Sequence, residues 1–253
     1  TPPLTLWYRK PAQKWVEALP IGNGRLGAMV FGGVENERLQ LNEDTLWSGG
    51  FKDTTSPNAK AALPAVRQAI QNGNYVEADQ LAKQLQGPFT QSYQPLGDLH
   101  LHVANVEAAS DYHRQLDLDT AIATTRYKVG DVSFTRQAFA SAPHQVIVLR
   151  LSADQAGQIS FVAAITSQLR HQVAPTPGGL LLTGKAPAHV EPSYRNFEPS
   201  VIYAEEENGV GLNFALALQI LNEGGELSIY DDRVEVVNAD AVTILLSAAT
   251  GFE

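Results

Sequence analysis

Residues 20–50 read PIGNGRLGAMVFGGVENERLQLNEDTLWSGG, and the fold of the chain is best predicted outward from this stretch. The Asn23-Gly24 pair stands between apolar flanks, where it indicates a tight turn. The apolar run 26–31 and the alternating residues 38–42 predict two strands that follow this turn. The stretch therefore predicts neighbouring strands of a sheet.

A group of hydrogen-bonding side chains follows the second of these strands. A polar turn at residues 35–37 is expected to join the two strands, and the second strand then ends on a loop. We expect Trp47 of this loop either to stack on a sugar or face another domain, or to cover a core. The polar residues beside this indole are Asn42, Glu43, Asp44 and Thr45.

Period-two alternation dominates the chain after Gly97. Leu99 and Leu101 share one face of a predicted strand, whereas His100 and His102 share the other. Strand spacing of roughly 8–12 residues with turn residues between is typical of a large antiparallel β-sandwich, so we expect a mainly β fold. Further strands are expected at residues 120–127, 132–140, 146–151, 159–165, 180–183, 201–205, 212–221, 227–230, 234–237 and 242–248.

Two segments interrupt this regular pattern. Residues 170–179 are rich in proline and glycine and predict a surface connection. Residues 186–199 form a long irregular segment, and loops of that length are often functional. His189 is the histidine of this segment and is therefore a candidate functional residue.

Near the start of the chain, two short runs at residues 6–8 and 15–19 carry aromatic residues suited to strands. We expect Trp7 and Trp15 to lie in the core.

A helical pattern occupies residues 56–87. Ser56-Pro57 is typical of a helix start, and Pro64 is expected to kink or restart that helix. Gly73 is expected to end the first helix, and Asn74 to cap a second. Without a linker, repeat or low-complexity tract, residues 1–253 are interpreted as a single β domain with a two-helix insertion.

Composition excludes several classes of function. The formal charge is −9 and no block of lysine or arginine is present, which argues against nucleic-acid binding. The longest apolar run, at residues 241–249, is far shorter than the ~20 residues of a spanning helix. Cysteine is absent. The start TPPL lacks signal-peptide features, so localisation stays open, with a secreted or periplasmic protein whose signal peptide was removed as one alternative.

Candidate catalytic groups are few. Glu43 and Asp44 are adjacent carboxylates, but neighbours on a strand point to opposite faces, so they are not expected to form a glycosidase pair. Glu43 is instead expected to bind an arginine, and Asp44 to satisfy loop amides. His100 and His102 share a face but have no adjacent third ligand, so neither a metal site nor a cofactor is predicted.

Three motifs together carry a family resemblance: residues 20–50, Tyr93–Leu99 (YQPLGDL) and Tyr112–Asp119 (YHRQLDLD). From about Leu6 to Ala249 the chain resembles the N-terminal domain of glycoside hydrolase family 95, which includes the 1,2-α-L-fucosidases. The resemblance implies a β-supersandwich that precedes an (α/α)6-barrel catalytic domain in inverting enzymes acting on α-L-fucosides or α-L-galactosides. It also implies that the acid and base residues belong to the barrel, which lies outside this sequence, so that this fragment alone is inactive.

Under this resemblance the chain is expected to support its own catalytic barrel and to shape the rim where a fucosylated glycan enters. The candidate rim or interface residues are Arg25, Asn42, Glu43, Asp44, Trp47, Gln94 and His189. Two alternatives remain open. One is a stand-alone carbohydrate-binding sandwich in which Trp47 or Tyr194 stacks on a sugar, and the other is a purely structural docking module.

Overall fold

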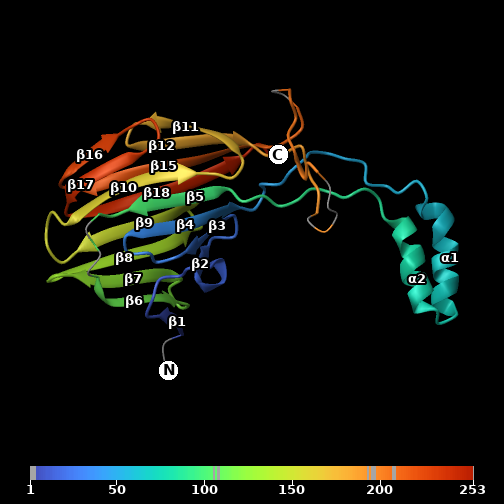
Figure 1. Ribbon diagram of the computed structural model, residues 1–253, viewed down its shortest axis with the longest axis horizontal. Helices are drawn as coiled ribbons and strands as arrows, with labels where there is room; N and C mark the ends of the chain where they lie inside the picture. The colour runs from blue at the N-terminus through green and yellow to red at the C-terminus, as the bar shows by residue number, and fades with distance from the viewer. Residues whose placement is uncertain are drawn as a thin grey trace. The chain divides into compact units, whose positions relative to one another are not determined.

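The computed structural model describes residues 4–104, 106, 109–192, 194, 198–206 and 209–252 (Figure 1). The protein is mainly β and its sheets are antiparallel, as the alternation predicted. Its residues form two compact units. Unit 1 contains residues 1–46, 94–186 and 212–253, and unit 2 contains residues 47–93 and 187–211.

Unit 1 is built on two sheets. The nine-stranded sheet has the order β1 (Thr5–Tyr8), β6 (Ser110–Asp117), β7 (Ile122–Val129), β8 (Val132–Ser141), β9 (Val146–Ala153), β18 (Ala241–Thr250), β15 (Asn213–Glu223), β12 (Gly179–Lys185) and β11 (Arg170–Thr176). The seven-stranded sheet has the order β16 (Glu226–Ile229), β17 (Val234–Ala239), β10 (Ile159–Thr166), β5 (Gly97–His102), β4 (Asn36–Glu43), β3 (Leu26–Val30) and β2 (Leu19–Gly22).

A single apolar core lies between these two sheets. Leu39 of β4 and Leu149 of β9, one from each sheet, are both almost fully buried in it. Along β5, Leu99 and Leu101 face this core while His100 and His102 are exposed. Side chains that alternate in this way bury one face of each sheet, which is the arrangement of a β-sandwich.

The predicted hairpin in residues 20–50 is confirmed. β2 and β3 pair with Gly22 opposite Gly27, and the turn between them contains Gly24 in the left-handed region at φ 95°. The side-chain oxygen of Asn23 accepts the N–H of Leu26 at 2.7 Å, which closes the turn. β3 then pairs with β4, and their register places Leu26 opposite Glu43.

Several expectations about unit 1 were wrong. Trp15–Glu17 is a short 3-10 helix rather than a strand, and Trp7 and Trp15 are 52% and 57% exposed rather than core. Trp7 lies on β1, which is an edge strand, so part of its ring faces solvent. The proline- and glycine-rich residues 170–179 contain β11, whose Pro175 is tolerated because β11 is also an edge.

Unit 2 contains the predicted helix pair. α1 (Ala59–Gln71) and α2 (Tyr75–Ala82) pack against each other and are followed by a 3-10 turn at Lys83–Leu85 (Figure 1). Asn74 is the N-cap of α2, as expected, whereas α1 continues through Pro64. The other regular elements of unit 2 are the short strands β13 (His189–Val190) and β14 (Val201–Ile202). No helix in the described part of the chain is long and apolar enough to span a membrane.

Candidate functional site

Arg25, in the turn between β2 and β3, connects both sheets of unit 1. Its Nη1 lies 3.2 Å from Oε1 of Glu43 at the end of β4 and donates to the carbonyl oxygen of Ala248 at 2.7 Å. Its Nε donates to Oε1 of Gln145, in the turn between β8 and β9, at 2.7 Å. One guanidinium thus links the seven-stranded sheet to β18 and to the β8–β9 turn of the other sheet.

Glu43 is held on both of its carboxylate oxygens. Oε2 accepts the backbone N–H of Thr45 at 2.8 Å and its hydroxyl at 2.7 Å. The Thr45 hydroxyl oxygen also lies 2.5 Å from that of Thr250 on β18. Glu43 is only 2% exposed, and its carboxylate oxygens accept their hydrogen bonds from Arg25 and Thr45. The expected arginine partner is confirmed, and the arrangement gives Glu43 a structural role.

The neighbours of Glu43 differ in exposure. Asn42 is half-buried on β4, and Asp44 is exposed in the turn that follows, with its N–H bonded to the Arg25 carbonyl at 3.0 Å. Gln94 is buried, and its N–H bonds the carbonyl of Leu46 at 3.0 Å. Asp44 is therefore placed to meet a ligand or partner directly, whereas the buried Gln94 is not.

Trp47 lies in unit 2, where it pairs with Tyr93. The two residues form an isolated antiparallel bridge, and their rings meet edge to face at 67° with centroids 5.3 Å apart. Trp47 is 41% exposed and Tyr93 42% exposed. An aromatic pair that keeps part of each side chain exposed is suited to stacking on a sugar ring or a partner surface.

His189 lines a surface depression within unit 2, here named the unit-2 hollow. Its imidazole Nε2 lies 3.0 Å from Oε1 of Glu191, which fixes the ring. The lining residues are Ser48, Gly49, Gly50, Phe51, Lys52, Thr90, Gln91, Ala188, His189 and Val210. The hollow therefore combines polar donors with the fully exposed ring of Phe51.

The predicted candidates thus fall into two groups. Arg25, Glu43 and Asp44 come together at one end of unit 1, and Asn42 precedes Glu43 on β4. Trp47 and His189 belong to unit 2. The described residues contain no group of three potential metal ligands.

A buried ion pair that sequence reasoning missed lies elsewhere in unit 1. Glu37 was expected in a polar turn, but it lies on β4 and is 2% exposed. Its Oε1 accepts the N–H groups of Gly32 and Arg38 at 2.8 and 3.0 Å, and its Oε2 lies 3.5 Å from Nη1 of Arg136 on β8. Burial raises the pKa of Glu37, and the Arg136 charge opposes that shift.

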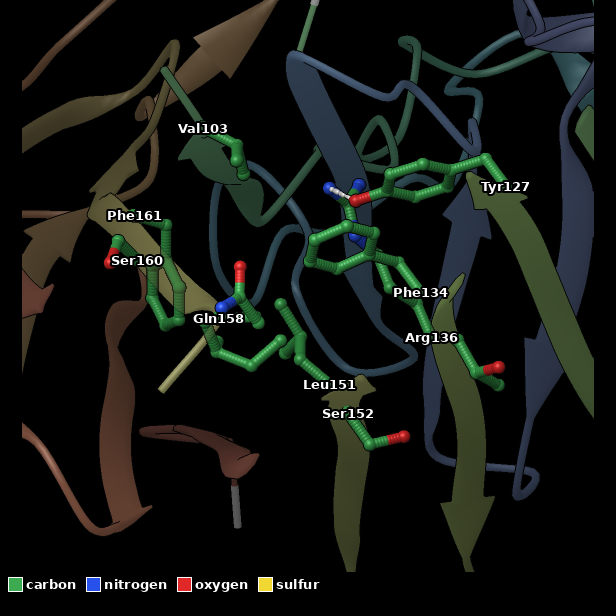
Figure 2. A pocket seen from close by; sticks show the side chains of 11 residues that line it. Val103, Tyr127, Phe134, Arg136, Leu151, Ser152, Gln158, Ser160 and Phe161 are labelled. Atoms are coloured by element: carbon green, nitrogen blue, oxygen red, sulfur yellow. Dashed lines mark hydrogen bonds between the residues drawn. The ribbon is translucent and has the colours of Figure 1, made fainter. Parts of the chain in front are cut away.

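Arg136 connects Glu37 to the aromatic side chains around it. Its Nη2 donates to the Tyr127 hydroxyl at 2.8 Å, and the Phe134 ring stacks on that of Tyr127 at 5.2 Å (Figure 2). The same guanidinium also donates to the carbonyl oxygens of Gly33 and Val34, which fixes the loop between β3 and β4. Glu37 lies two and four residues before the buried Leu39 and Leu41, so all three share one face of the strand. This period-two pattern was the signal that could have placed the carboxylate in the core.

Comparisons with known proteins match almost the whole chain. Residues 6–253 match the family model described as "Glycosyl hydrolase family 65, N-terminal domain". The chain is 36% identical over 258 residues to Alpha-L-fucosidase 2 of Arabidopsis thaliana, covering 99% of this chain and 31% of that protein. It is 37% identical over 169 residues to Probable alpha-fucosidase A of Aspergillus niger, covering 63% of this chain and 20% of that protein.

Among solved structures, a putative kojibiose phosphorylase from human microbiome aligns with a TM-score of 0.46 and 9% identity, over 98% of this chain and 33% of that one. The chain thus spans about a third or less of the length of each of these proteins.

Proposed function

The chain belongs to the family of glycosyl hydrolase family 65 N-terminal domains, and from this premise we propose that it is the non-catalytic N-terminal domain of an exo-acting, inverting α-L-fucosidase of the family 95 type. In this role it supports a catalytic (α/α)6 barrel and shapes the rim through which a fucosylated glycan reaches the active site. The fragment alone has no turnover.

The observation that carries the proposal is the match to Alpha-L-fucosidase 2. The identity of 36% runs along 99% of this chain but covers 31% of that protein. Two-thirds of such a protein would therefore lie outside this sequence, which leaves room for a separate catalytic domain. The match to Probable alpha-fucosidase A supports the same sugar.

The chemistry of the carboxylates supports an assignment of catalysis elsewhere. Glycoside hydrolysis usually needs one carboxyl group to protonate the leaving oxygen and a second to activate water or attack. Glu43 is buried, and both of its oxygens accept hydrogen bonds from Arg25 or Thr45. The adjacent Glu43-Asp44 pair is therefore suited to holding a loop and not to proton transfer.

The rim role rests on the groups that remain exposed. Asp44 emerges from a turn fixed by the Arg25–Glu43 pair, and Trp47 keeps 41% of its surface open beside Tyr93. Rigid polar and aromatic groups on a defined scaffold are the kind that position a sugar. Kinetics of the full-length enzyme carrying Asp44→Ala or Trp47→Ala test this role, with Trp15→Ala as the control.

Each rim variant is expected to raise KM on an α-1,2-fucosylated oligosaccharide severalfold with a smaller change in kcat. Trp15→Ala is expected to leave both constants unchanged, because that exposed tryptophan lies on the 3-10 helix of unit 1 and outside the candidate groups. Wild-type constants in both Asp44→Ala and Trp47→Ala would overturn the rim role.

A second candidate function is a stand-alone carbohydrate-binding module, which the exposed Trp47–Tyr93 pair favours. This alternative requires fucoside binding by the isolated chain at millimolar or better affinity, with loss of binding in Trp47→Ala. Titration calorimetry of the isolated chain distinguishes it from the scaffold role, for which Trp47→Ala is expected to leave any binding by the isolated chain unchanged.

A further inference from the structure

The unit-2 hollow carries a charge pattern that the chain as a whole does not share. The formal charge of the chain is −9, yet the described residues lining the hollow include Lys52 and His189 and no carboxylate. Glu191 lies 3.0 Å from His189 and balances any charge on that ring, so Lys52 is the cation that acts on a ligand in the hollow. The hollow therefore favours a ligand that accepts hydrogen bonds or carries negative charge.

Backbone packing builds the floor of this hollow. Gly49 has φ 76°, its N–H donates to the Pro187 carbonyl at 2.7 Å, and a Cβ on it would lie 3.3 Å from the Ala188 carbonyl oxygen. A Cβ on Gly50 would lie 3.3 Å from a methyl carbon of Val210. Two glycines thus let residues 48–50 run against the segments that carry Ala188 and Val210, which holds the walls in place.

Two lining side chains are themselves oriented by the protein. Lys52 Nζ donates to the Phe89 carbonyl at 2.8 Å, which uses one of its three donors. His189 Nε2 pairs with Glu191 at 3.0 Å, so Nδ1 lies outside that pair. The remaining N–H donors of Lys52 can therefore bind an anionic group, and His189 Nδ1, the acceptor of the ring whose Nε2–H donates to Glu191, can accept a hydrogen bond from a hydroxyl.

Phe51 supplies the apolar wall. Its ring is fully exposed, and large exposed apolar side chains gathered at a polar hollow are typical of binding surfaces. A pyranose ring has one apolar face, which stacks on an aromatic ring, while its polar substituents reach donors at the edge. Phe51 beside Lys52 and His189 offers both kinds of contact.

We propose that the unit-2 hollow is a subsite for an anionic sugar residue, in which Lys52 binds a carboxylate or sulfate group, His189 accepts a hydrogen bond from a sugar hydroxyl and Phe51 stacks on the ring. This inference rests on the proposed function in that it assigns the acidic sugar to the same glycan that carries the fucose. Lys52 binds the anion and Glu191 acts as a positioning residue for His189.

Titration of the chain with four oligosaccharides tests the proposal. Three probes share one fucosylated core and are neutral, carboxylated (sialylated) or sulfated, and the fourth is the sulfated probe without its fucose. At low salt, at least one acidic fucosylated probe is expected to bind about fivefold more tightly than the neutral probe, the gain of one exposed charge contact. This preference is expected to shrink at high salt.

Variants assign the effect to the hollow. Lys52→Met is expected to abolish the preference for the acidic probe, whereas Lys60→Met, which removes an exposed lysine from α1, is expected to keep it. Equal affinity for neutral and both acidic probes, or an unchanged preference in Lys52→Met, overturns the inference.

Failure of this inference differs from failure of the proposed function. Binding of the sulfated probe that lacks fucose, with no fucose release by the full-length protein, would keep the subsite and contradict the fucosidase assignment. Fucose release by the full-length protein with no preference for acidic probes would support the fucosidase assignment and contradict the subsite. A preference for the sialylated probe identifies a carboxylate ligand, and one for the sulfated probe identifies a sulfate ester.

Discussion

The Arg25 guanidinium and the Glu43 carboxylate lie 3.2 Å apart, and the same Arg25 nitrogen donates to the Ala248 carbonyl at 2.7 Å. The pair thus fixes the start of β3 to the end of β4 and both to β18 of the facing sheet. Because Glu43 is 2% exposed, removing its cation would leave a buried carboxylate without its charge partner.

Arg25→Met is expected to lower the free energy of unfolding by about 2 kcal/mol, less than a fully buried pair because Arg25 is partly exposed. Urea denaturation measures this loss. A double-mutant cycle with Glu43→Gln is expected to show coupling of about 1 kcal/mol.

The control is Arg233→Met, which removes the exposed pair with Asp232 and is expected to change stability by less than about 0.5 kcal/mol. Equal losses in Arg25→Met and Arg233→Met would contradict the clamp.

Glu37 predicts a pH dependence. Burial raises its folded pKa above the ordinary 4.5, so the folded state binds more protons than the unfolded state just above pH 4.5. This contribution to stability is complete below pH 4.5 and is lost as pH rises through the folded pKa. In urea denaturation at a series of pH values above 4.5, the free energy of unfolding of the wild type is therefore expected to fall relative to that of Glu37→Gln. A pH-independent difference between the two proteins would show that Glu37 does not titrate in this window.

Gly49 and Gly73 form a matched pair, since both have φ 76°. An added Cβ meets nothing within 4 Å at Gly73 but lies 3.3 Å from the Ala188 carbonyl oxygen at Gly49. Gly73→Ala is expected to cost about 1 kcal/mol from backbone strain alone, and Gly49→Ala more. Hydrogen exchange reports the difference: faster exchange of the residue-49 N–H, which bonds Pro187, is expected in Gly49→Ala only.

The three tryptophans give a spectroscopic check of the fold. Trp7, Trp15 and Trp47 are 52%, 57% and 41% exposed. Indole emission of the native chain is therefore expected close to that of tryptophan in water and open to acrylamide quenching. A blue-shifted emission protected from acrylamide would mean that these rings are buried, as the sequence alone suggested for Trp7 and Trp15.

Local pattern was enough to predict most of the sheet structure. Leu99 and Leu101 alternate with His100 and His102, and the strand and its buried face follow directly from that period. The helix pair was equally visible, because Asn74 is a strong cap signal. Such elements depend on residues that are neighbours in sequence, so the sequence alone identifies them.

Features that depend on distant partners could not be predicted. The alternation along β4 could have placed Glu37 in the core, but its partner Arg136, on β8, could not be identified from the sequence. Trp7 resembles a core residue until β1 proves to be an edge strand. For the candidate site, the arginine partner of Glu43 was anticipated, but its link through Arg25 to Ala248 requires the packing of two sheets. The unit-2 hollow likewise combines segments well over a hundred residues apart, such as those of Lys52 and His189.

The central claim is that this chain is non-catalytic and that a separate domain carries out catalysis. Fucose release tests this claim most directly. Purified residues 1–253 and the full-length protein are incubated with an α-1,2-fucosylated oligosaccharide, and free fucose is quantified. The account predicts release by the full-length protein and none above background by residues 1–253. Sustained release by residues 1–253 alone would contradict it.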